Sequence, residues 1–312
     1  MILSVSRRTD IPAFYSDWFF NRVKEGFLLV RNPMNIHQLS KVNILPDVVD
    51  CMVFWTKNPK PMLERLNELN SYNYYFQFTL NSYDKNIEIN VPEKKDIIKT
   101  FQKLSNMIGR NRVVWRYDPI FLTNEFNIDY HIKWFDYLAE KLSGYTNKCV
   151  ISFIDLYKKT QKNLSGINLI EMNEDLIAAI SYEISNIASK YSMPVETCSE
   201  KIDLSKYNIK HGKCIDEQLI ARITGKRIES AKDPNQRLIC GCIKSIDIGA
   251  YNTCKHNCLY CYANFNKEMV YKNVSLHNDS SPLLCGEVNE NDNITLRVVS
   301  SDFRNQLSFL EE

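Results

Sequence analysis

The chain has 312 residues, of which 44% are hydrophobic and 24% are charged, and its formal net charge is +2. This ordinary globular composition suffices for one large domain or two average ones with a sizeable buried core. The small net charge excludes a general attraction to nucleic acid or anionic lipid, and no apolar run reaches the roughly 18 to 20 residues of a membrane span. The N-terminal MILSVSRRTD places its arginines after its short apolar run, the reverse of a secretory signal. We therefore expect a cytoplasmic protein with no membrane partner.

Short runs of β-branched, aromatic and other apolar residues recur along the first two-thirds of the chain. They are ILSVS at 2–6, CMVFWT at 51–56, YYFQFTL at 74–80, VVWRY at 113–117, CVISFI at 149–154 and MPVETC at 193–198. Nearly continuous apolar runs of this length are typical of parallel strands that are buried on both faces. The runs therefore predict six strands.

Helical patterns separate these strands. Residues 93–109, 127–143 and 174–191 repeat apolar side chains every three or four positions, and FYSDWFFNRVKEG at 14–26 predicts a fourth helix. The segment 28–42 interrupts the alternation and predicts a hairpin. Strands that alternate with helices imply a parallel sheet, so we expect an α/β fold in the form of a partial or complete parallel βα barrel. No G-x-G-x-x-G turn follows the first strand, which argues against dinucleotide binding.

Polar residues gather where the predicted strands end. SRRTDIP follows the first strand, WTKNP the second and RYDPI the fourth, and the sixth ends in ETC. In βα barrels the substrate site is built from the carboxyl ends of the strands, and paired arginines beside an aspartate suit a carboxylate or phosphate. The alternative is a structural ion-pair network built from the same groups. The residues expected to bind cofactor or substrate at the barrel mouth are Arg7, Arg8, Asp10, Lys57, Arg116, Asp118 and Glu196.

The ten cysteines are unevenly placed, because eight of them lie between residues 198 and 285. In a cytoplasmic chain, closely spaced cysteines are more often metal ligands than disulfide partners. Cys254, Cys258 and Cys261 follow the spacing C-x3-C-x2-C, with Tyr260 directly before the last. Three thiolates leave one iron of a four-iron cluster without a protein ligand, and that iron can chelate a small molecule.

Zinc is the structural alternative for this stretch. Structural zinc usually takes four ligands, often as two C-x2-C pairs. Cys258 and Cys261 form one such pair, and the ligands that could complete a site are Cys240, Cys242 and His256.

Four further late cysteines invite a second inference; they are Cys198, Cys214, Cys240 and Cys242. Four thiolates suffice for a second, fully ligated cluster. Alternatively, one of them is a fourth ligand of the first cluster, or all are inert thiols that pack as small hydrophobes. Cys51 and Cys149 lie within predicted strands and are expected in the core, whereas Cys285 lies in a polar tail and is expected to be exposed.

The three-cysteine stretch resembles the signature of the radical S-adenosylmethionine superfamily. That resemblance implies a partial βα barrel and a four-iron four-sulfur cluster whose open iron binds S-adenosylmethionine. It also implies a reductant such as flavodoxin or ferredoxin, and cleavage to a 5′-deoxyadenosyl radical that abstracts a hydrogen from the substrate. In that superfamily the loop normally follows the first barrel strand, and a glycine-glycine-glutamate stretch follows the second. Here the loop follows all six predicted strands, so it must fold back over the barrel mouth or serve another purpose.

Nearly the whole chain resembles the bacterial family known as domain of unknown function 1848. The segments that carry the resemblance are SRRTDIP, FWTKNP, QFTL, RYDPI, ETCSE, GKCID and NQRLICGCIKSIDIGAYNTCKHNCLYCYAN. The resemblance implies an iron–sulfur protein of radical-enzyme type and names no substrate, so a small molecule or a peptide is equally open. The ending YCYAN is similar to the cluster loops of the spore photoproduct lyase branch, but the charge balance does not support a nucleic-acid substrate.

We expect one integrated domain. It comprises a βα barrel over 1–198, a cysteine-rich cluster-binding segment over 199–266 packed on the barrel mouth, and a C-terminal tail over 267–312 with a strand at NITLRVVS and an irregular end at LSFL. The expected function is that of a radical S-adenosylmethionine-type enzyme. The alternative is a non-enzymatic or metal-independent barrel protein with a structural zinc or a closed electron-transfer cluster.

Overall fold

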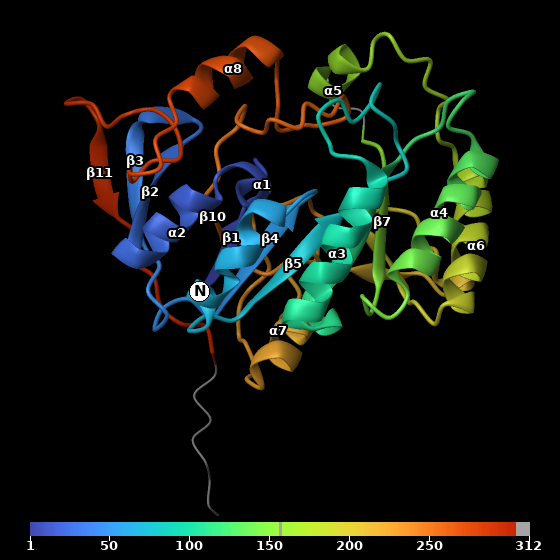
Figure 1. Cartoon of the computed structure of the whole chain (residues 1–312), viewed down its shortest axis with the longest axis horizontal. Helices are drawn as coiled ribbons and strands as arrows, with labels where there is room; N and C mark the ends of the chain where they lie inside the picture. Colours follow the sequence, from blue (N-terminus) through green and yellow to red (C-terminus); the bar gives the residue numbers. More distant parts are fainter. Residues whose placement is uncertain (156–157, 304–312) are drawn as a thin grey trace, which may run out of the picture.

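The computed structural model of the protein describes residues 1–155 and 158–303. At its centre is a sheet of eight strands in the spatial order β10-β1-β4-β5-β6-β7-β8-β9 (Figure 1), and every neighbouring pair is parallel. The strands are β1 (Ile2–Val5), β4 (Cys51–Thr56), β5 (Tyr74–Thr79), β6 (Val113–Ile120), β7 (Cys149–Phe153), β8 (Val195–Cys198), β9 (Lys210–Gly212) and β10 (Ile246–Asp247). Closure of the sheet by pairing between β9 and β10 is not detected in these residues, so the fold is a mixed α/β fold with a large parallel sheet.

The six strands expected from apolar runs are all present. Every residue of β1 and β7 is buried, and so are five of the six residues of β4, as expected for strands covered on both faces. The two further strands, β9 and β10, have three and two residues. Strands this short show neither an apolar run nor an alternation, so the sequence pattern gives no sign of them.

The four expected helices are also confirmed, to within two residues at each end. The helices of the described chain are α1 (Ile11–Phe14), α2 (Ser16–Glu25), η1 (Lys60–Leu69), α3 (Lys94–Ile108), η2 (Arg110–Arg112), α4 (Ile128–Leu142), α5 (Lys158–Asn163), α6 (Glu174–Lys190), η3 (Ser205–Tyr207), α7 (Glu217–Thr224) and α8 (Lys267–Ser275). Local chemistry sets several of their ends. Asn127 and Asn173 cap the first turns of α4 and α6 with their side-chain oxygens. Helix α2 ends at Gly26, whose φ of 77° is in the left-handed region.

A second, three-stranded sheet lies beside α2 (Figure 1), in the order β11-β3-β2. The strands β2 (Phe27–Asn32) and β3 (Asn35–Asn43) pair antiparallel and confirm the hairpin expected over 28–42. Strand β11 (Asn293–Leu296) lies within NITLRVVS and pairs parallel with β3. Helix α8 was not expected from the sequence, and the end LSFL lies outside the described residues.

The two faces of the large sheet are covered differently. A large apolar core packs on the face that carries α2, α3, α4 and α6. The other face, with alternate strand residues such as Val53 and Val114, packs against the segment that contains Cys214, Cys240 and Cys242. Among the described residues, no helix combines the length and apolar character needed to cross a bilayer.

Cys51 and Cys149 are fully buried in their strands, as expected. Cys285 is half-buried rather than exposed, because the neighbouring Leu283 and Leu284 are buried and anchor this part of the chain. Burial accordingly raises the pKa of the Cys285 thiol.

Candidate functional site

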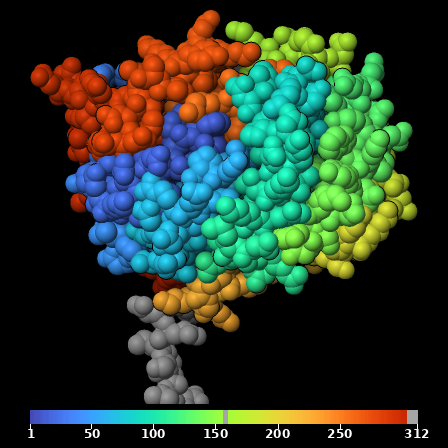
Figure 2. All heavy atoms as spheres, viewed as in Figure 1, coloured from blue at the N-terminus to red at the C-terminus, as the bar shows by residue number. Residues whose placement is uncertain are grey.

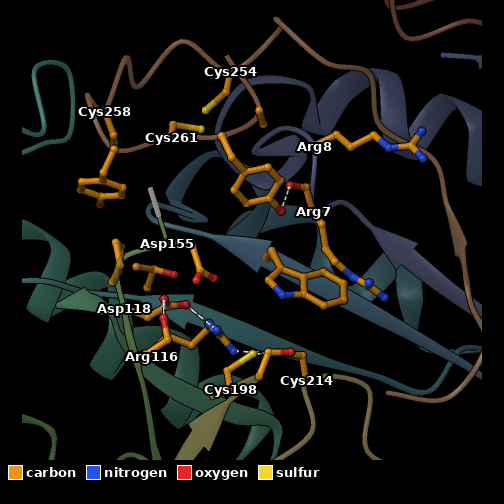
Figure 3. Close-up of a pocket in the computed structure, with 18 of the residues that line it drawn as sticks. Arg7, Arg8, Arg116, Asp118, Asp155, Cys198, Cys214, Cys254, Cys258 and Cys261 are labelled. Atoms are coloured by element: carbon orange, nitrogen blue, oxygen red, sulfur yellow. Dashed lines mark hydrogen bonds and ion pairs between the residues drawn. The ribbon is translucent and has the colours of Figure 1, made fainter. Parts of the chain in front are cut away.

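A cavity of about 430 Å³ lies at the carboxyl ends of β1, β4, β6, β7 and β8. The late, orange part of the chain covers this end of the molecule next to the blue N-terminal segment (Figure 2). All seven cysteines named above as metal-ligand candidates line the cavity. Cys254, Cys258 and Cys261, which we call the roof, lie on one side, and Cys198 and Cys214 lie on the opposite side (Figure 3). With Cys240 and Cys242, these last two form a group that we call the floor.

The roof reaches the cavity because it follows β10. This strand pairs parallel with β1, with Leu3 opposite Ile246 and Ser4 opposite Asp247. The chain therefore leaves β10 at the same edge of the sheet at which SRRTDIP leaves β1. Gly249 lies so close to this segment that a Cβ there would be 2.0 Å from Ser6 Oγ. The position of the cysteines late in the sequence is thus compatible with a place beside the first strand.

Asp10 joins three segments around the roof. Its Oδ1 accepts a hydrogen bond from the backbone N–H of Ala13 at 3.0 Å. Its Oδ2 accepts one from the backbone N–H of Lys57 at 2.7 Å and lies 2.9 Å from Nε2 of His256, which is within the cysteine loop. Both carboxylate oxygens are therefore used by protein groups, and Asp10 positions the loop.

Glu88 is a site residue that sequence reasoning missed. Its side chain is 2% exposed, and its carboxylate binds Lys57 Nζ at 2.7 Å, Lys94 Nζ and the hydroxyl of Tyr260. Burial opposes the charge of Glu88, but the two lysines outweigh it and lower the pKa to about 2. The backbone of Glu88 also forms an isolated bridge with that of Cys258. No local pattern marks this glutamate, because its partners are up to 172 residues away.

Arg116 and Asp118 lie between roof and floor (Figure 3). Arg116 Nε donates to Asp118 Oδ2 at 2.9 Å, and its Nη1 donates to the sulfur of Cys214 at 3.0 Å. Burial disfavours the charged carboxyl of Asp118, but Arg116 and a hydrogen bond from Ser152 hold its pKa below the ordinary value. The pair thus places a buried guanidinium directly against one of the floor sulfurs.

The remaining predicted binding residues differ in their placement. Arg7 packs over Trp55, with its guanidinium carbon 5.2 Å from the ring centroid, and lines the cavity. Arg8 lines it too, but its guanidinium stacks over Tyr251 and points away from the roof (Figure 3). Glu196 does not line the cavity.

The side chain of Glu196 binds Lys148 Nζ at 2.7 Å. Glu196 lies two residues before Cys198 on β8, and Lys148 directly precedes β7. Because side chains two positions apart share a face of a strand, Glu196 lies on the same face as Cys198 but nearer the amino end of the sheet.

The cavity wall contains buried polar atoms without a hydrogen-bond partner among the described residues. Those that belong to lining residues are Arg7 Nε, Thr9 Oγ1, Thr160 Oγ1, His256 Nδ1 and Asn264 Oδ1. Buried polar groups are normally paired, so these atoms fit a polar ligand inside the cavity. Three thiols and unpaired donors and acceptors in one cavity are the groups that a cluster with a chelating small molecule requires.

No group of three or more His, Cys, Asp and Glu side chains in the described ranges is arranged to hold a metal ion as it stands. The ligand thiolates of a polynuclear cluster are separated by its several irons, so they lie farther apart than the ligands of a single ion.

The family model described as a domain of unknown function (DUF1848) matches residues 2–263. No curated protein and no solved structure matches the chain.

Proposed function

The chain belongs to the domain of unknown function 1848 family, and on this premise we propose that it is an iron–sulfur enzyme of the radical S-adenosylmethionine type. Cys254, Cys258 and Cys261 would hold a four-iron four-sulfur cluster with one open iron, at which S-adenosylmethionine binds. The observation that carries the proposal is the place of this loop. It starts at the carboxyl end of a parallel strand and lines a cavity whose wall contains unpaired polar atoms.

The strand order supports the same proposal. We interpret the open eight-stranded sheet as a partial βα barrel, with the segment 199–266 packed over its mouth. β10 then takes the place that the first barrel strand holds in the radical S-adenosylmethionine superfamily, and β1 takes the next place. On this interpretation the strands follow one another in a permuted order along the chain, and the late cysteine loop lies at the same place in the barrel as the cysteine loop of that superfamily.

The residues of the cavity would have different roles. The three thiolates bind the cluster, and Asp10 and Glu88 hold their loop in place. Lys57 and Arg7 bring positive charge to the wall, where they suit the carboxylate of a bound amino acid or substrate. When bound and reduced by a donor such as flavodoxin or ferredoxin, the cluster supplies the electron that cleaves S-adenosylmethionine and releases a 5′-deoxyadenosyl radical. The substrate would be a small molecule or a peptide that fits the cavity.

The test is anaerobic reconstitution with iron and sulfide, followed by dithionite and S-adenosylmethionine. We expect a brown protein that produces 5′-deoxyadenosine, and we expect Cys258→Ala to lose this product completely. Cys285→Ala is the matched control, because that thiol is half-buried but does not line the cavity, and it should keep full activity. A colourless protein with one zinc per chain would contradict the proposal. A brown protein that bleaches on reduction without forming deoxyadenosine would favour a closed electron-transfer cluster.

A further inference from the structure

The floor brings together four thiols from three separate segments. Cys198 ends β8, Cys214 lies between β9 and α7, and Cys240 and Cys242 lie before β10. The sulfurs of Cys198 and Cys214 are 3.0 Å apart, and the thiol of Cys242 interacts with those of both Cys214 and Cys240. The distance of 3.0 Å is longer than the roughly 2.05 Å of a disulfide, and all four cysteines are free.

This convergence differs from the way the chain uses its other buried cysteines. Cys51 and Cys149 each lie alone within an apolar strand, as small hydrophobic residues do. The floor cysteines instead form a chain of sulfur contacts at the base of a cavity that contains unpaired polar atoms. Four inert thiols would not need to be collected from three segments that lie 16 and 26 residues apart along the sequence.

Positive charge faces the floor from two directions. Arg116 is 5% exposed and donates from Nη1 to the sulfur of Cys214 at 3.0 Å. The guanidinium of Arg7 is also within electrostatic range of Cys214 and Cys242. A buried guanidinium is costly unless negative charge compensates it. Asp118 pairs with Arg116, and Asp247 lies within electrostatic range of Arg7. Four thiolates with their metal would add net negative charge on the side of both arginines that faces the floor.

We infer that Cys198, Cys214, Cys240 and Cys242 ligate a second iron–sulfur cluster, closed by four cysteines and separate from the roof. Zinc is disfavoured by the spacing of the cysteines. Structural zinc sites commonly use C-x2-C pairs, whereas a single residue separates Cys240 from Cys242. Cys214, Cys240 and Cys242 lie outside helices and strands, so their sulfurs can move apart around a cluster without breaking regular structure. A four-cysteine cluster has no open iron, so it does not bind S-adenosylmethionine.

Iron counting in matched variants tests this inference. One variant removes the roof thiols (Cys254→Ala, Cys258→Ala, Cys261→Ala), and another removes floor thiols (Cys214→Ala, Cys240→Ala, Cys242→Ala). Each is reconstituted without oxygen, checked for folding by circular dichroism, and analysed for iron, sulfide and zinc. We expect about eight irons per wild-type chain and about four in each variant, because each cluster has four irons. Cys285→Ala should keep all of them.

Electron paramagnetic resonance of the reduced proteins separates the two centres. The roof variant should keep a cluster signal that does not change when S-adenosylmethionine is added, and the floor variant should keep one that does. The inference is overturned if the folded roof variant binds no iron or if the floor variant keeps all its iron. It is also overturned if the wild type contains one zinc per chain that the floor variant lacks. If the floor variant does not fold, the iron and the signal of the roof variant decide the question. Loss of deoxyadenosine formation in a protein with eight irons would instead count against the proposed function alone.

Discussion

The roof and the floor of the cavity both consist of cysteines, but different contacts hold them. The roof is a short loop whose position is fixed by side chains from other segments, chiefly Asp10 and Glu88. The floor is held by contacts among its own sulfurs, by Arg116, and by Tyr75 and Gln77, which donate to the backbone carbonyl of Cys214 at 2.6 and 2.9 Å. A centre that must leave one metal position open needs its ligands fixed from outside. A centre closed by four ligands can be organised by the metal itself.

This difference predicts that substitutions of the residues that contact the roof loop, such as Asp10 and Glu88, damage the roof and spare the floor. The roof depends on hydrogen bonds and ion pairs that exist before any metal binds, so their loss should appear both in the stability of the chain and in iron retention. The floor depends on the thiols, so it should survive the same substitutions.

The largest effect is expected at Glu88. Glu88→Gln removes the buried charge that two partly exposed lysines share and leaves Lys57 and Lys94 without their common partner. Breaking a buried ion pair from one side costs about 3 to 5 kcal/mol. We expect that loss in the free energy of unfolding measured with urea, together with loss of iron from the roof only.

The matched control for this substitution is Glu93→Gln. Glu93 also faces a lysine, Lys85 at 3.7 Å, but both side chains are more than half exposed. Exposed pairs contribute about 0 to 1 kcal/mol, so this variant should resemble the wild type. Equal destabilisation by the two variants would show that the Glu88 network does not brace the roof.

A smaller effect is expected from pH at His131 on α4, which contacts Tyr117 on β6, the strand that also carries Arg116. His131 is fully buried, with Nδ1 2.8 Å from the Tyr117 hydroxyl and Nε2 3.0 Å from the carbonyl of Phe121. Burial lowers its pKa from 6.5 to about 4, despite the backbone hydrogen bond. The unfolded chain therefore binds more protons between pH 6.5 and pH 4, so stability falls as the pH is lowered through this window. The loss amounts to about 3 kcal/mol.

Urea unfolding of the metal-free chain at pH 7.5, 6, 5 and 4 measures this effect. The difference between wild type and His131→Gln should shrink as the pH falls, because only the wild type loses the contribution of a neutral histidine. The control is His211→Gln, at an exposed position, which leaves the buried His131 intact and should therefore keep the fall in stability that His131 causes. A constant difference between wild type and His131→Gln at all four pH values would contradict the assignment.

Roof and floor also differ in how far the sequence predicted them. The spacing of Cys254, Cys258 and Cys261 is local, so one pattern identified the whole roof. The floor cysteines were singled out as a group, but their convergence depends on β9 and β10, which are too short to leave a pattern. Likewise, the apolar runs predicted the six longer strands, because burial on both faces is visible in the sequence.

The residues that hold the cysteine segments in place were largely not predicted from the sequence, for a similar reason. Glu88 lies in an irregular loop, and its binding to Tyr260 becomes apparent only in the folded chain. Glu196 was expected at the cavity because it lies near the end of a strand. Glu196 lies two residues before Cys198 on β8, and its side chain binds Lys148 there instead of reaching the cavity.

The smallest effect is expected for Asp10→Asn. This variant keeps every cysteine and tests whether the roof and the floor are held independently. Asp10 accepts hydrogen bonds on both oxygens, from Ala13 on one side and from Lys57 and His256 on the other. An asparagine must place its NH₂ group on one of these sides, where it faces donors in either orientation. We expect a loss of about 2 kcal/mol in the free energy of unfolding, typical of a hydrogen bond to a charged group.

The decisive measurement for Asp10→Asn is the rate at which a chelator removes iron. The variant should lose about half of its iron faster than the wild type and the rest at the wild-type rate, because Asp10 touches the roof loop and none of the floor cysteines. Asp17→Asn is the control, since Asp17 is largely exposed in its pair with Arg65, and it should leave both rates unchanged. A uniform acceleration of iron loss in Asp10→Asn would mean that roof and floor are not independently held.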